Sequence, residues 1–206
     1  MTGVVRALIL AALCGLILGS CKPNVGPRDE VAVLETNYGR IVFEFLPDDA
    51  PRHVANFKEL TREGFYNGTR FHKIVKDRRN SPIAIQGGDP NTISGAPSTW
   101  GYGQPGQKTI PAEFSKTLRH SRGTVSAARR TSDPNSATSQ FFICVTDDPE
   151  YDGQFSIFAR VIDGMNIVES IAKAPTLTNS TVPLDPVVVQ RIYLVRRSEL
   201  DLASGN

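Results

Sequence analysis

The stretch "RFHKIVKDRRNSPIAIQGGDP", residues 70–90, sets the first constraint on the fold. Residues 70–75 and 83–86 are rich in β-branched, aromatic and other apolar side chains, which favours two short strands. Residues 76–80, "KDRRN", lie between them and are too polar to be buried, so we expect an exposed connection. The two glycines of "QGGDP" then favour a bend or close packing of the backbone. The stretch predicts β-structure interrupted by a charged insert.

The rest of the chain continues this β-rich pattern. Gly39 can take the positive φ that a tight hairpin needs. A helix is expected to start near Pro51, with Val54 and Phe57 at helical spacing. Further strands are expected over residues 31–34, 41–46, 124–128, 140–145, 156–161 and 187–195, and a second short helix over 163–174. About eight strands and two short helices around one core indicate a mainly-β antiparallel barrel or sandwich.

Residues 1–20 do not belong to this fold. Arg6 is their only charge, and residues 7–18 form an unbroken apolar run of twelve residues. A helix of that length spans roughly 18 Å, well short of the ~30 Å hydrocarbon core of a bilayer. A positive start, a short apolar run and small residues after it are typical of a secretory signal. We therefore assign residues 1–20 to a signal peptide.

The segment "LGSC", residues 18–21, resembles the lipobox of bacterial lipoproteins. In that family the cysteine is acylated and the chain is cut just before it. The resemblance implies lipidation of Cys21 and anchoring on the periplasmic side of the cell envelope, with the outer membrane favoured over the inner. A soluble secreted protein and an uncleaved anchor are the alternatives. We expect residues 21–29 to form a lipidated tether, 30–198 the folded domain and 199–206 a C-terminal tail.

Cysteine use and net charge limit the possible functions. Cys14 falls in the signal peptide and Cys21 in the lipobox, so Cys144 has no disulfide partner and is expected to be a small buried hydrophobe. Without residues 1–20, 22 basic residues face 21 acidic ones, because only Arg6 is removed from the 23. That balance gives no electrostatic case for nucleic-acid binding.

Three motifs carry more information than the strand pattern. They are "FHK" with the later "QGGDP", "SDPNSATSQFFIC" over residues 132–144, and "DGQFSIFARVIDGMNIVESI" over 152–171. Together they resemble the cyclophilins, a family of peptidyl-prolyl isomerases, and the resemblance runs from about residue 31 to 196. It implies a closed eight-stranded antiparallel β-barrel with a helix over each open end. It also implies that the partners are proline-containing polypeptide segments.

Rotation about an X–Pro bond needs no nucleophile, metal or cofactor. Resonance sets a barrier of ~18–20 kcal/mol, and a donor aimed at the prolyl nitrogen lowers it by localising the lone pair. In cyclophilins the donor is an Arg two residues after the Phe of "FH", the Gln of "QGGD" orients it, and a Phe of "SQFF" forms the pocket floor. The resemblance places Lys73, Gln86 and Phe142 at these catalytic positions. It places substrate-binding residues at Ile83, Ala84, Ala128 (with Ala127 as the alternative), Tyr151 and Phe155.

Several of these positions depart from the family pattern. Lys73 stands in place of the Arg, Glu150 or Tyr151 in place of a frequent Trp, and Phe155 in place of a His or Tyr. Lysine is a compact, strongly hydrated point charge, whereas arginine offers a planar fork. One hypothesis is therefore a weak or absent activity with retained binding of proline segments. The other is compensation by a nearby guanidinium, for which the candidates are Arg78, Arg79, Arg129 and Arg130.

Two other functional classes compete with the isomerase. A non-catalytic proline-binding or chaperone module tethered to the membrane is the main alternative, favoured by the changed positions, whereas Gln86 and Phe142 favour the isomerase. A hydrolase using Asp147 and Asp148 is disfavoured, because neighbours on a strand point to opposite faces. The histidines (His53, His72 and His120) have no metal-ligand spacing, and His53 is expected to be exposed on its helix. We expect a monomer without metal or cofactor.

Overall fold

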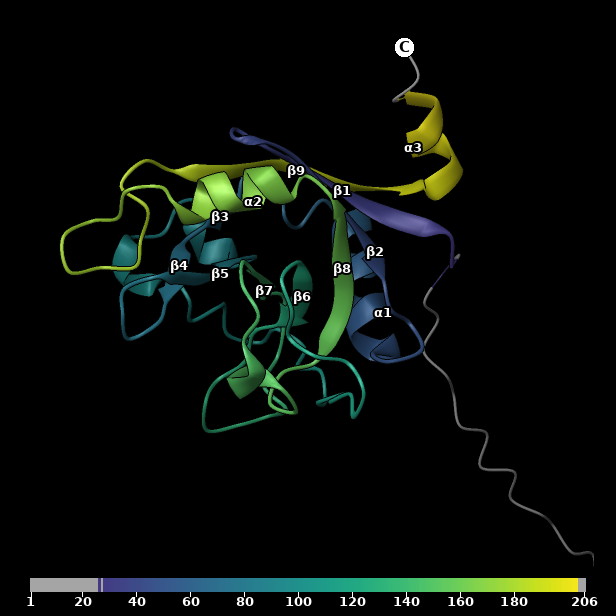
Figure 1. Cartoon of the computed structure of the whole chain (residues 1–206), viewed down its shortest axis with the longest axis horizontal. Helices are drawn as coiled ribbons and strands as arrows, with labels where there is room; N and C mark the ends of the chain where they lie inside the picture. Colours follow the sequence, from purple (N-terminus) through teal and green to yellow (C-terminus); the bar gives the residue numbers. More distant parts are fainter. Residues whose placement is uncertain (1–25, 27, 204–206) are drawn as a thin grey trace, which may run out of the picture.

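A computed structural model describes residue 26 and residues 28–203 of the chain. The predicted signal peptide, Cys21 and residues 204–206 lie outside the described residues. Within the described part, nine strands form one sheet whose pairings are all antiparallel and which curls into a nearly closed barrel (Figure 1). The strands are β1 Glu30–Thr36, β2 Gly39–Phe45, β3 Arg70–Phe71, β4 Lys73–Lys76, β5 Pro82–Gly87, β6 Thr124–Ala127, β7 Phe141–Cys144, β8 Ile157–Asp163 and β9 Val187–Arg196. The mainly-β antiparallel barrel is thus confirmed.

The two edge strands of the sheet are joined in the chain by a single residue, His72. The sheet order is β3-β9-β1-β2-β8-β6-β7-β5-β4, so β3 and β4 are its two ends, and only His72 separates them in the chain. β3 pairs with β9 while β4 pairs with β5, and the His72 backbone N donates to the Gln86 carbonyl O at 3.0 Å. The single strand expected over residues 70–75 is therefore two strands facing two different partners. This division is why the structure has nine strands where eight were expected.

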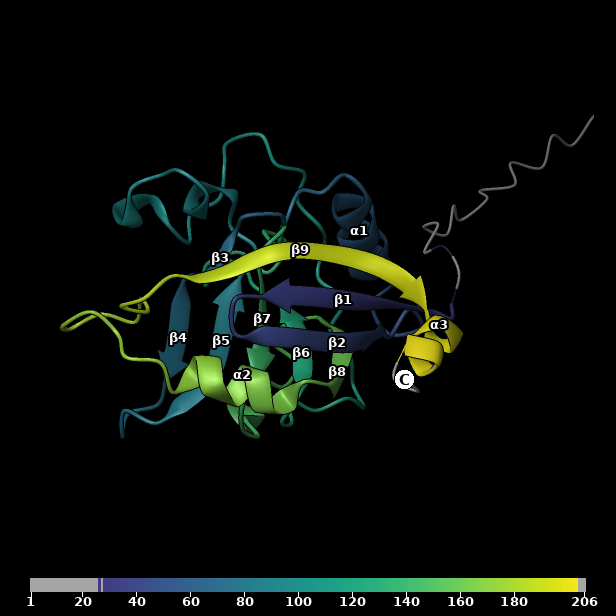
Figure 2. The same cartoon turned by 90° about the horizontal axis from the view of Figure 1, so that it is seen from above.

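Three α-helices accompany the barrel: α1 Pro51–Arg62, α2 Met165–Ala172 and α3 Arg197–Ala203. α1 and α2 were both expected, and they cover opposite sides of the barrel (Figures 1 and 2). α3 was not expected, because the sequence from residue 199 onward was assigned to a tail. Short 3-10 turns occur at η1 Pro90–Thr92, η2 Pro97–Thr99 and η3 Pro149–Tyr151. None of the helices in the described residues combines the length and apolar character needed to span a bilayer.

An aromatic cluster fills the barrel beneath α1. Phe57 of α1 lies 5.3 Å from Phe43, 4.8 Å from Tyr66 and 5.5 Å from Phe141, measured between ring centroids. All four rings are buried. Such spacings lie within the favourable range for aromatic pairs. The helix therefore contributes one side of the core, as the spacing of its apolar residues predicted.

The start of α1 is held by a carboxylate from a distant segment. Glu113 accepts from the backbone N of Arg52 and His53 at 3.0 Å each and lies 2.7 Å from His53 Nδ1. His53 is only 4% exposed. The prediction that it is exposed was wrong, because the segment carrying Glu113 covers the first turn of the helix.

The charged insert forms the exposed turn of the β4–β5 hairpin, as expected. Asp77 closes this turn: its backbone N donates to Ser81 O, and its Oδ1 accepts from the backbone N of Arg79 and Ser81 at 2.9 and 2.8 Å. Asn80 takes a positive φ of 64°, which short polar side chains tolerate best after glycine. The insert is therefore an ordered turn in which Arg78 and Arg79 are exposed, whereas Lys76 is half-buried.

Candidate active site

The three predicted catalytic residues lie in one row across neighbouring strands. Lys73 on β4 is paired directly with Gln86 on β5, and Gln86 is paired directly with Phe142 on β7. Directly paired residues of adjacent strands share one face of a sheet. Lys73 is exposed, Gln86 is half-buried and Phe142 is 4% exposed. Their proposed roles remain predictions, but the register brings the three side chains to the same outer face of the barrel.

Phe142 is the centre of a separate apolar cluster outside the main core. It packs with Tyr151 at 5.5 Å and Phe155 at 5.2 Å between ring centroids, and these two rings are 4.9 Å apart. Tyr151 and Phe155 are only partly buried, so the cluster reaches the surface. Its other members are Val75, Ala84, Ala128 and Cys144. This aromatic surface has the apolar character that a proline ring requires.

The structure also locates the remaining predicted substrate-binding residues. Ala128 belongs to the cluster around Phe142, whereas Ala127 lies in the main core. Ile83 is not part of that cluster and instead lines a neighbouring cleft with Tyr151. Glu150 is exposed on the same cleft. Of the two candidates for the position of the family's frequent Trp, Tyr151 therefore packs on Phe142 and Glu150 does not.

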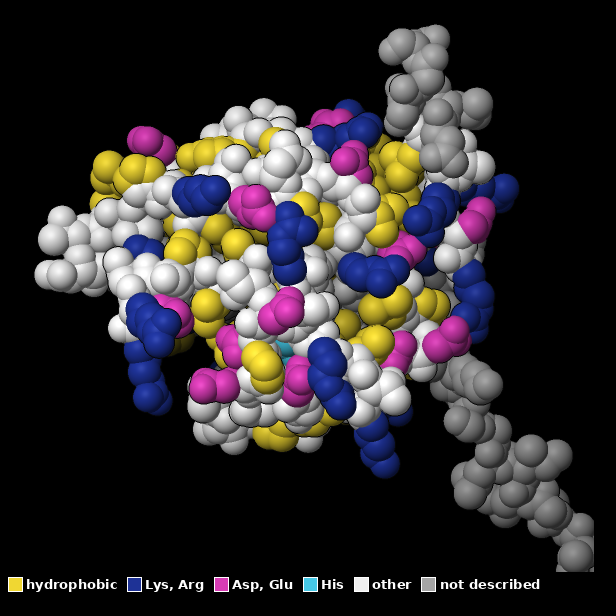
Figure 3. All heavy atoms as spheres, viewed as in Figure 1, with side chains coloured by type: hydrophobic (Ala, Val, Ile, Leu, Met, Phe, Trp, Pro, Cys, Tyr) yellow, Lys and Arg dark blue, Asp and Glu magenta, His cyan; other side chains and the backbone are white. Residues whose placement is uncertain are grey.

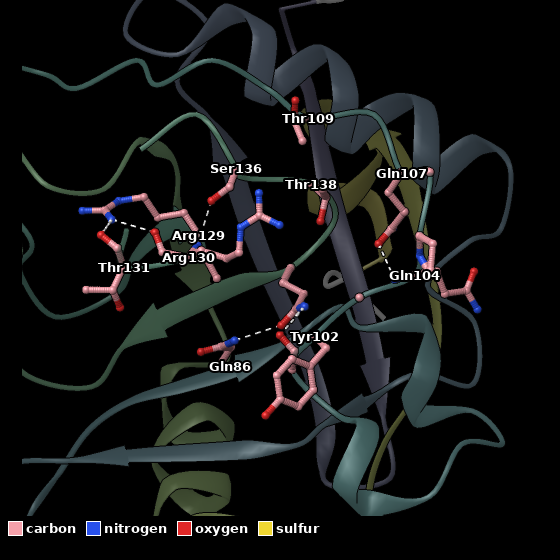
Figure 4. Close-up of a pocket in the computed structure, with 16 residues that line it drawn as sticks. Gln86, Tyr102, Gln104, Gln107, Thr109, Arg129, Arg130, Thr131, Ser136 and Thr138 are labelled. Atoms are coloured by element: carbon pink, nitrogen blue, oxygen red, sulfur yellow. Dashed lines mark hydrogen bonds between the residues drawn. The ribbon is translucent and has the colours of Figure 1, made fainter. Parts of the chain in front are cut away.

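A cavity of about 650 Å³ adjoins Gln86 and Ala128 (Figure 4). The Gln86 amide Nε2 donates to Gln140 Oε1 at 3.0 Å, and Gln140 Nε2 donates to the Gly101 carbonyl O at 3.0 Å. These two bonds link the row of site residues to the loop that forms the far wall of the cavity. Gln140 was not singled out by the sequence, although it stands within the "SQFF" motif.

Arg129 stands between this cavity and the apolar cluster. Its guanidinium carbon lies 4.9 Å from the centroid of the Phe155 ring. Its Nε donates to Gln154 O at 2.9 Å, and its Nη1 donates to the carbonyl oxygens of Arg130 and Thr131 (Figure 4). Of the four arginines considered as compensating cations, Arg129 is thus held in place by backbone oxygens.

A second cleft of about 590 Å³ lies on the other side of Tyr151. Arg78 and Arg79 of the hairpin form one wall. The acidic wall carries Asp147 and Asp148 from the loop before η3 and Glu150 from η3 itself. In Figure 3, basic side chains lie over the β4–β5 hairpin at the left, and acidic side chains lie on the neighbouring surface around η3. The charged insert therefore borders the region around the candidate pocket.

The two titratable side chains of the apolar cluster, Cys144 and Tyr151, both have raised pKa values. Burial raises the pKa of the Cys144 thiol to about 12, and the thiol has no disulfide partner, so it is a buried apolar neighbour of Phe142 as expected. Burial, followed by Asp148, raises the pKa of Tyr151. Both groups are neutral at physiological pH. In the described residues no three His, Cys, Asp or Glu side chains are grouped so as to hold a metal ion.

A nearly closed antiparallel barrel with an aromatic pocket on its outer face beside a glutamine amide is the architecture expected of the cyclophilin class. The comparisons with known proteins agree. The family model described as "Cyclophilin type peptidyl-prolyl cis-trans isomerase/CLD" matches residues 31–194. The chain therefore belongs to the cyclophilin-type peptidyl-prolyl cis-trans isomerases.

Individual relatives support this assignment. A "Probable peptidyl-prolyl cis-trans isomerase" of Brucella abortus is 35% identical over 185 residues, which cover 88% of this chain and 92% of the relative. A peptidyl-prolyl cis-trans isomerase of Acinetobacter baylyi is 37% identical over 169 residues, covering 78% and 83%. A cyclophilin-type isomerase of Cryptosporidium parvum, crystallised in the presence of the dipeptide Ala-Pro, superposes with a TM-score of 0.68 at 31% identity, covering 81% of this chain and 99% of that one.

Proposed function

We propose that this isomerase accelerates rotation about X–Pro bonds in envelope or secreted polypeptides, at the row formed by Lys73, Gln86 and Phe142. The observation that carries the proposal is the direct pairing of these residues across β4, β5 and β7. The proline ring rests on the aromatic cluster, while the polar side chains beside it face the rotating bond. The related Cryptosporidium structure, obtained in the presence of the dipeptide Ala-Pro, supports a proline-binding site on this fold.

The proposed chemistry is stabilisation of a twisted amide. A donor near the prolyl nitrogen favours the pyramidal form, and each ~1.4 kcal/mol of selective transition-state stabilisation gives about tenfold in rate. Gln86 is oriented by Gln140, and Lys73 supplies the positive charge. Because the Lys73 ammonium is exposed and hydrated, we propose a reduced rather than a maximal rate.

The test is a prolyl isomerisation assay of the full-length chain with a series of short X–Pro peptides, comparing the wild type with Phe142→Ala. The wild type should exceed the uncatalysed rate. Removing Phe142 deletes the pocket floor, so kcat/KM and peptide affinity should fall by at least about tenfold. Truncation of a buried Phe costs roughly 3–5 kcal/mol of stability, so circular dichroism must confirm folding at the assay temperature.

Phe65→Ala is the matched control, because Phe65 is a partly buried aromatic residue that packs against the main core instead. It should leave the rate per folded molecule unchanged. A folded Phe142→Ala chain with normal peptide binding contradicts the proposed pocket. A wild-type rate equal to that of buffer contradicts catalysis and favours the non-catalytic binding or chaperone module.

We further propose that the domain acts as a monomer held at the membrane through a lipidated Cys21, on the periplasmic side and at the outer membrane. Two observations support this arrangement. "LGSC" directly follows the short apolar run. The described chain begins beside α3, at the opposite end of the domain from the β4–β5 hairpin (Figures 1 and 2). A tether at that end leaves the proposed site open to client polypeptides.

A further inference from the structure

A buried histidine packs against the aromatic pocket. His120 is 2% exposed, and its ring is nearly parallel to that of Phe142, with centroids 6.1 Å apart and planes at 17°. The same imidazole meets Tyr151 at 5.9 Å and Phe155 at 6.3 Å in steep orientations. All three aromatic side chains of the pocket therefore pack on one ring. The orientation of that ring affects the shape of the whole pocket.

Hydrogen bonds fix the orientation of His120. Its Nδ1 lies 3.1 Å from Asp152 Oδ1, its Nε2 lies 3.0 Å from Ser126 Oγ, and its backbone N donates to Asp152 Oδ1 at 2.7 Å. An ionised carboxylate can only accept, so Nδ1 carries the proton and Nε2 accepts from the Ser126 hydroxyl. The neutral ring makes both bonds in this sense. Protonation would reverse the bond to Ser126, since the hydroxyl would then have to accept from Nε2.

Ser126, His120 and Asp152 are connected in the same way as a nucleophilic triad, but their location excludes that chemistry. Ser126 has no exposed surface, and it is paired directly with Phe142 on the neighbouring strand β7. A nucleophilic hydroxyl must reach a substrate carbonyl, and a fully buried one cannot. The three residues can orient the pocket but cannot react with a substrate.

We propose that His120, held between Asp152 and Ser126, is a positioning residue for isomerisation, which keeps Phe142, Tyr151 and Phe155 in the arrangement that accepts a proline ring. The inference rests on the proposed function of this pocket. Small displacements of groups that position a substrate reduce rates strongly. Protonation of Nε2 forces the Ser126 hydroxyl to turn round and accept, and it places a charge in the buried site behind the pocket, so acid should disturb the pocket and slow the reaction.

Several titratable or charged groups surround His120: Asp148, Asp152, Arg119, Tyr151 and Cys144. Burial lowers the pKa of His120 below its ordinary 6.5, although Asp152 and Asp148 oppose the shift. Asp152 has a lowered pKa, first through the bond from the His120 backbone, and stays ionised. The raised pKa values of Tyr151 and Cys144 keep both neutral. The loss of rate should therefore begin below pH 6.5 and follow His120.

The test compares full-length wild type, His120→Phe and Ser126→Ala. kcat, KM and equilibrium affinity for one X–Pro peptide are measured from about pH 4.5 to 8. His120→Phe keeps an aromatic ring without either polar contact, and Ser126→Ala removes only the hydroxyl. Both should lower kcat/KM about tenfold at neutral pH, because the pocket loses its fixed geometry. The acid decline of the wild type should be absent in His120→Phe.

His53→Phe is the matched control, since His53 is also buried and bonded to a carboxylate, but lies on α1. It should keep both the rate and the acid decline. Wild-type kinetics in both His120→Phe and Ser126→Ala overturn the inference, as does a wild type without an acid decline. If His120→Phe does not fold, Ser126→Ala and the wild-type pH profile decide.

If the wild-type isomerisation rate does not exceed the rate in buffer alone, the proposed catalytic function is contradicted. The positioning role of His120 is not contradicted by that result. Peptide affinity then decides: weaker binding in both variants, with wild-type affinity falling in acid, supports the inference. Unchanged affinity in both overturns it.

Discussion

Lys73 is the residue at which the site departs most from the arrangement that the cyclophilin family implies. It is exposed and directly opposite Gln86, whose Nε2 is already bonded to Gln140. An ammonium must shed tightly held water to donate toward a prolyl nitrogen, and it cannot bridge Gln86 and substrate through one rigid fork. The catalysed rotation should be slow, yet faster than the uncatalysed one, which takes roughly tens to hundreds of seconds.

Lys73→Arg should therefore raise kcat/KM, by up to about tenfold, because a guanidinium can contact Gln86 and substrate together. Lys73→Ala should lower it several-fold. The measurement is the isomerisation rate for one X–Pro peptide. Lys76→Arg on the same strand is the control, because its Nζ lies 3.5 Å from Thr176 Oγ1, away from the row.

An alternative outcome would identify the insert as the source of charge. Arg78 and Arg79 line the cleft beside Tyr151, and neither makes an ion pair within the described residues. If Lys73→Arg has no effect and replacing both hairpin arginines with alanine slows the reaction, these residues supply the cation. If no substitution changes a rate that equals that of buffer, the catalytic role is wrong.

At the scale of elements, α1 depends on a contact that lies outside the helix. Burial raises the pKa of Glu113, but hydrogen bonds from the His53 side chain and from the Arg52 and His53 backbone outweigh it, so the pKa lies below 4.5. A carboxylate with a lowered pKa stabilises the fold fully above its unfolded value. That contribution is lost as pH falls through the lower folded value.

Glu113→Ala should therefore destabilise the domain by roughly 1.5–3 kcal/mol at neutral pH, the range for a hydrogen bond to a charged group. The difference from wild type should shrink as the pH falls below 4.5, because wild-type Glu113 then becomes protonated. Urea unfolding at several pH values measures this difference in the free energy of unfolding. Glu59→Ala, at an exposed position of α1, should change stability little, and an equal loss in both variants would contradict the capping role.

The strands and the two main helices were predictable, because their apolar spacing is local in the sequence. The division of residues 70–75 was not, because it depends on which partners lie on either side of His72. The burial of His53 was missed for the same reason, since Glu113 is 60 residues away along the chain. Contacts between residues so far apart along the chain leave no periodic signal in a single sequence.

The candidate site shows the same limit at the scale of the whole molecule. The motifs identified Gln86 and Phe142, but their alignment with Lys73 in one row follows from the sheet register. His120 was considered only as a metal ligand. Its partners Ser126 and Asp152 lie 6 and 32 residues away, and only the closed barrel brings them behind the pocket.

The sequence before the described residues leads to a prediction for the whole protein. If Cys21 is lipidated, Cys21→Ser should no longer incorporate labelled fatty acid and should move from the membrane fraction to the soluble fraction or accumulate as precursor. Cys14→Ser is the matched control and should keep the label, because Cys14 lies within the apolar run. Since the described chain starts at the end of the domain away from the hairpin, purified Cys21→Ser should isomerise peptides at the wild-type rate (Figure 2). Labelling that persists in Cys21→Ser would contradict lipidation at this residue.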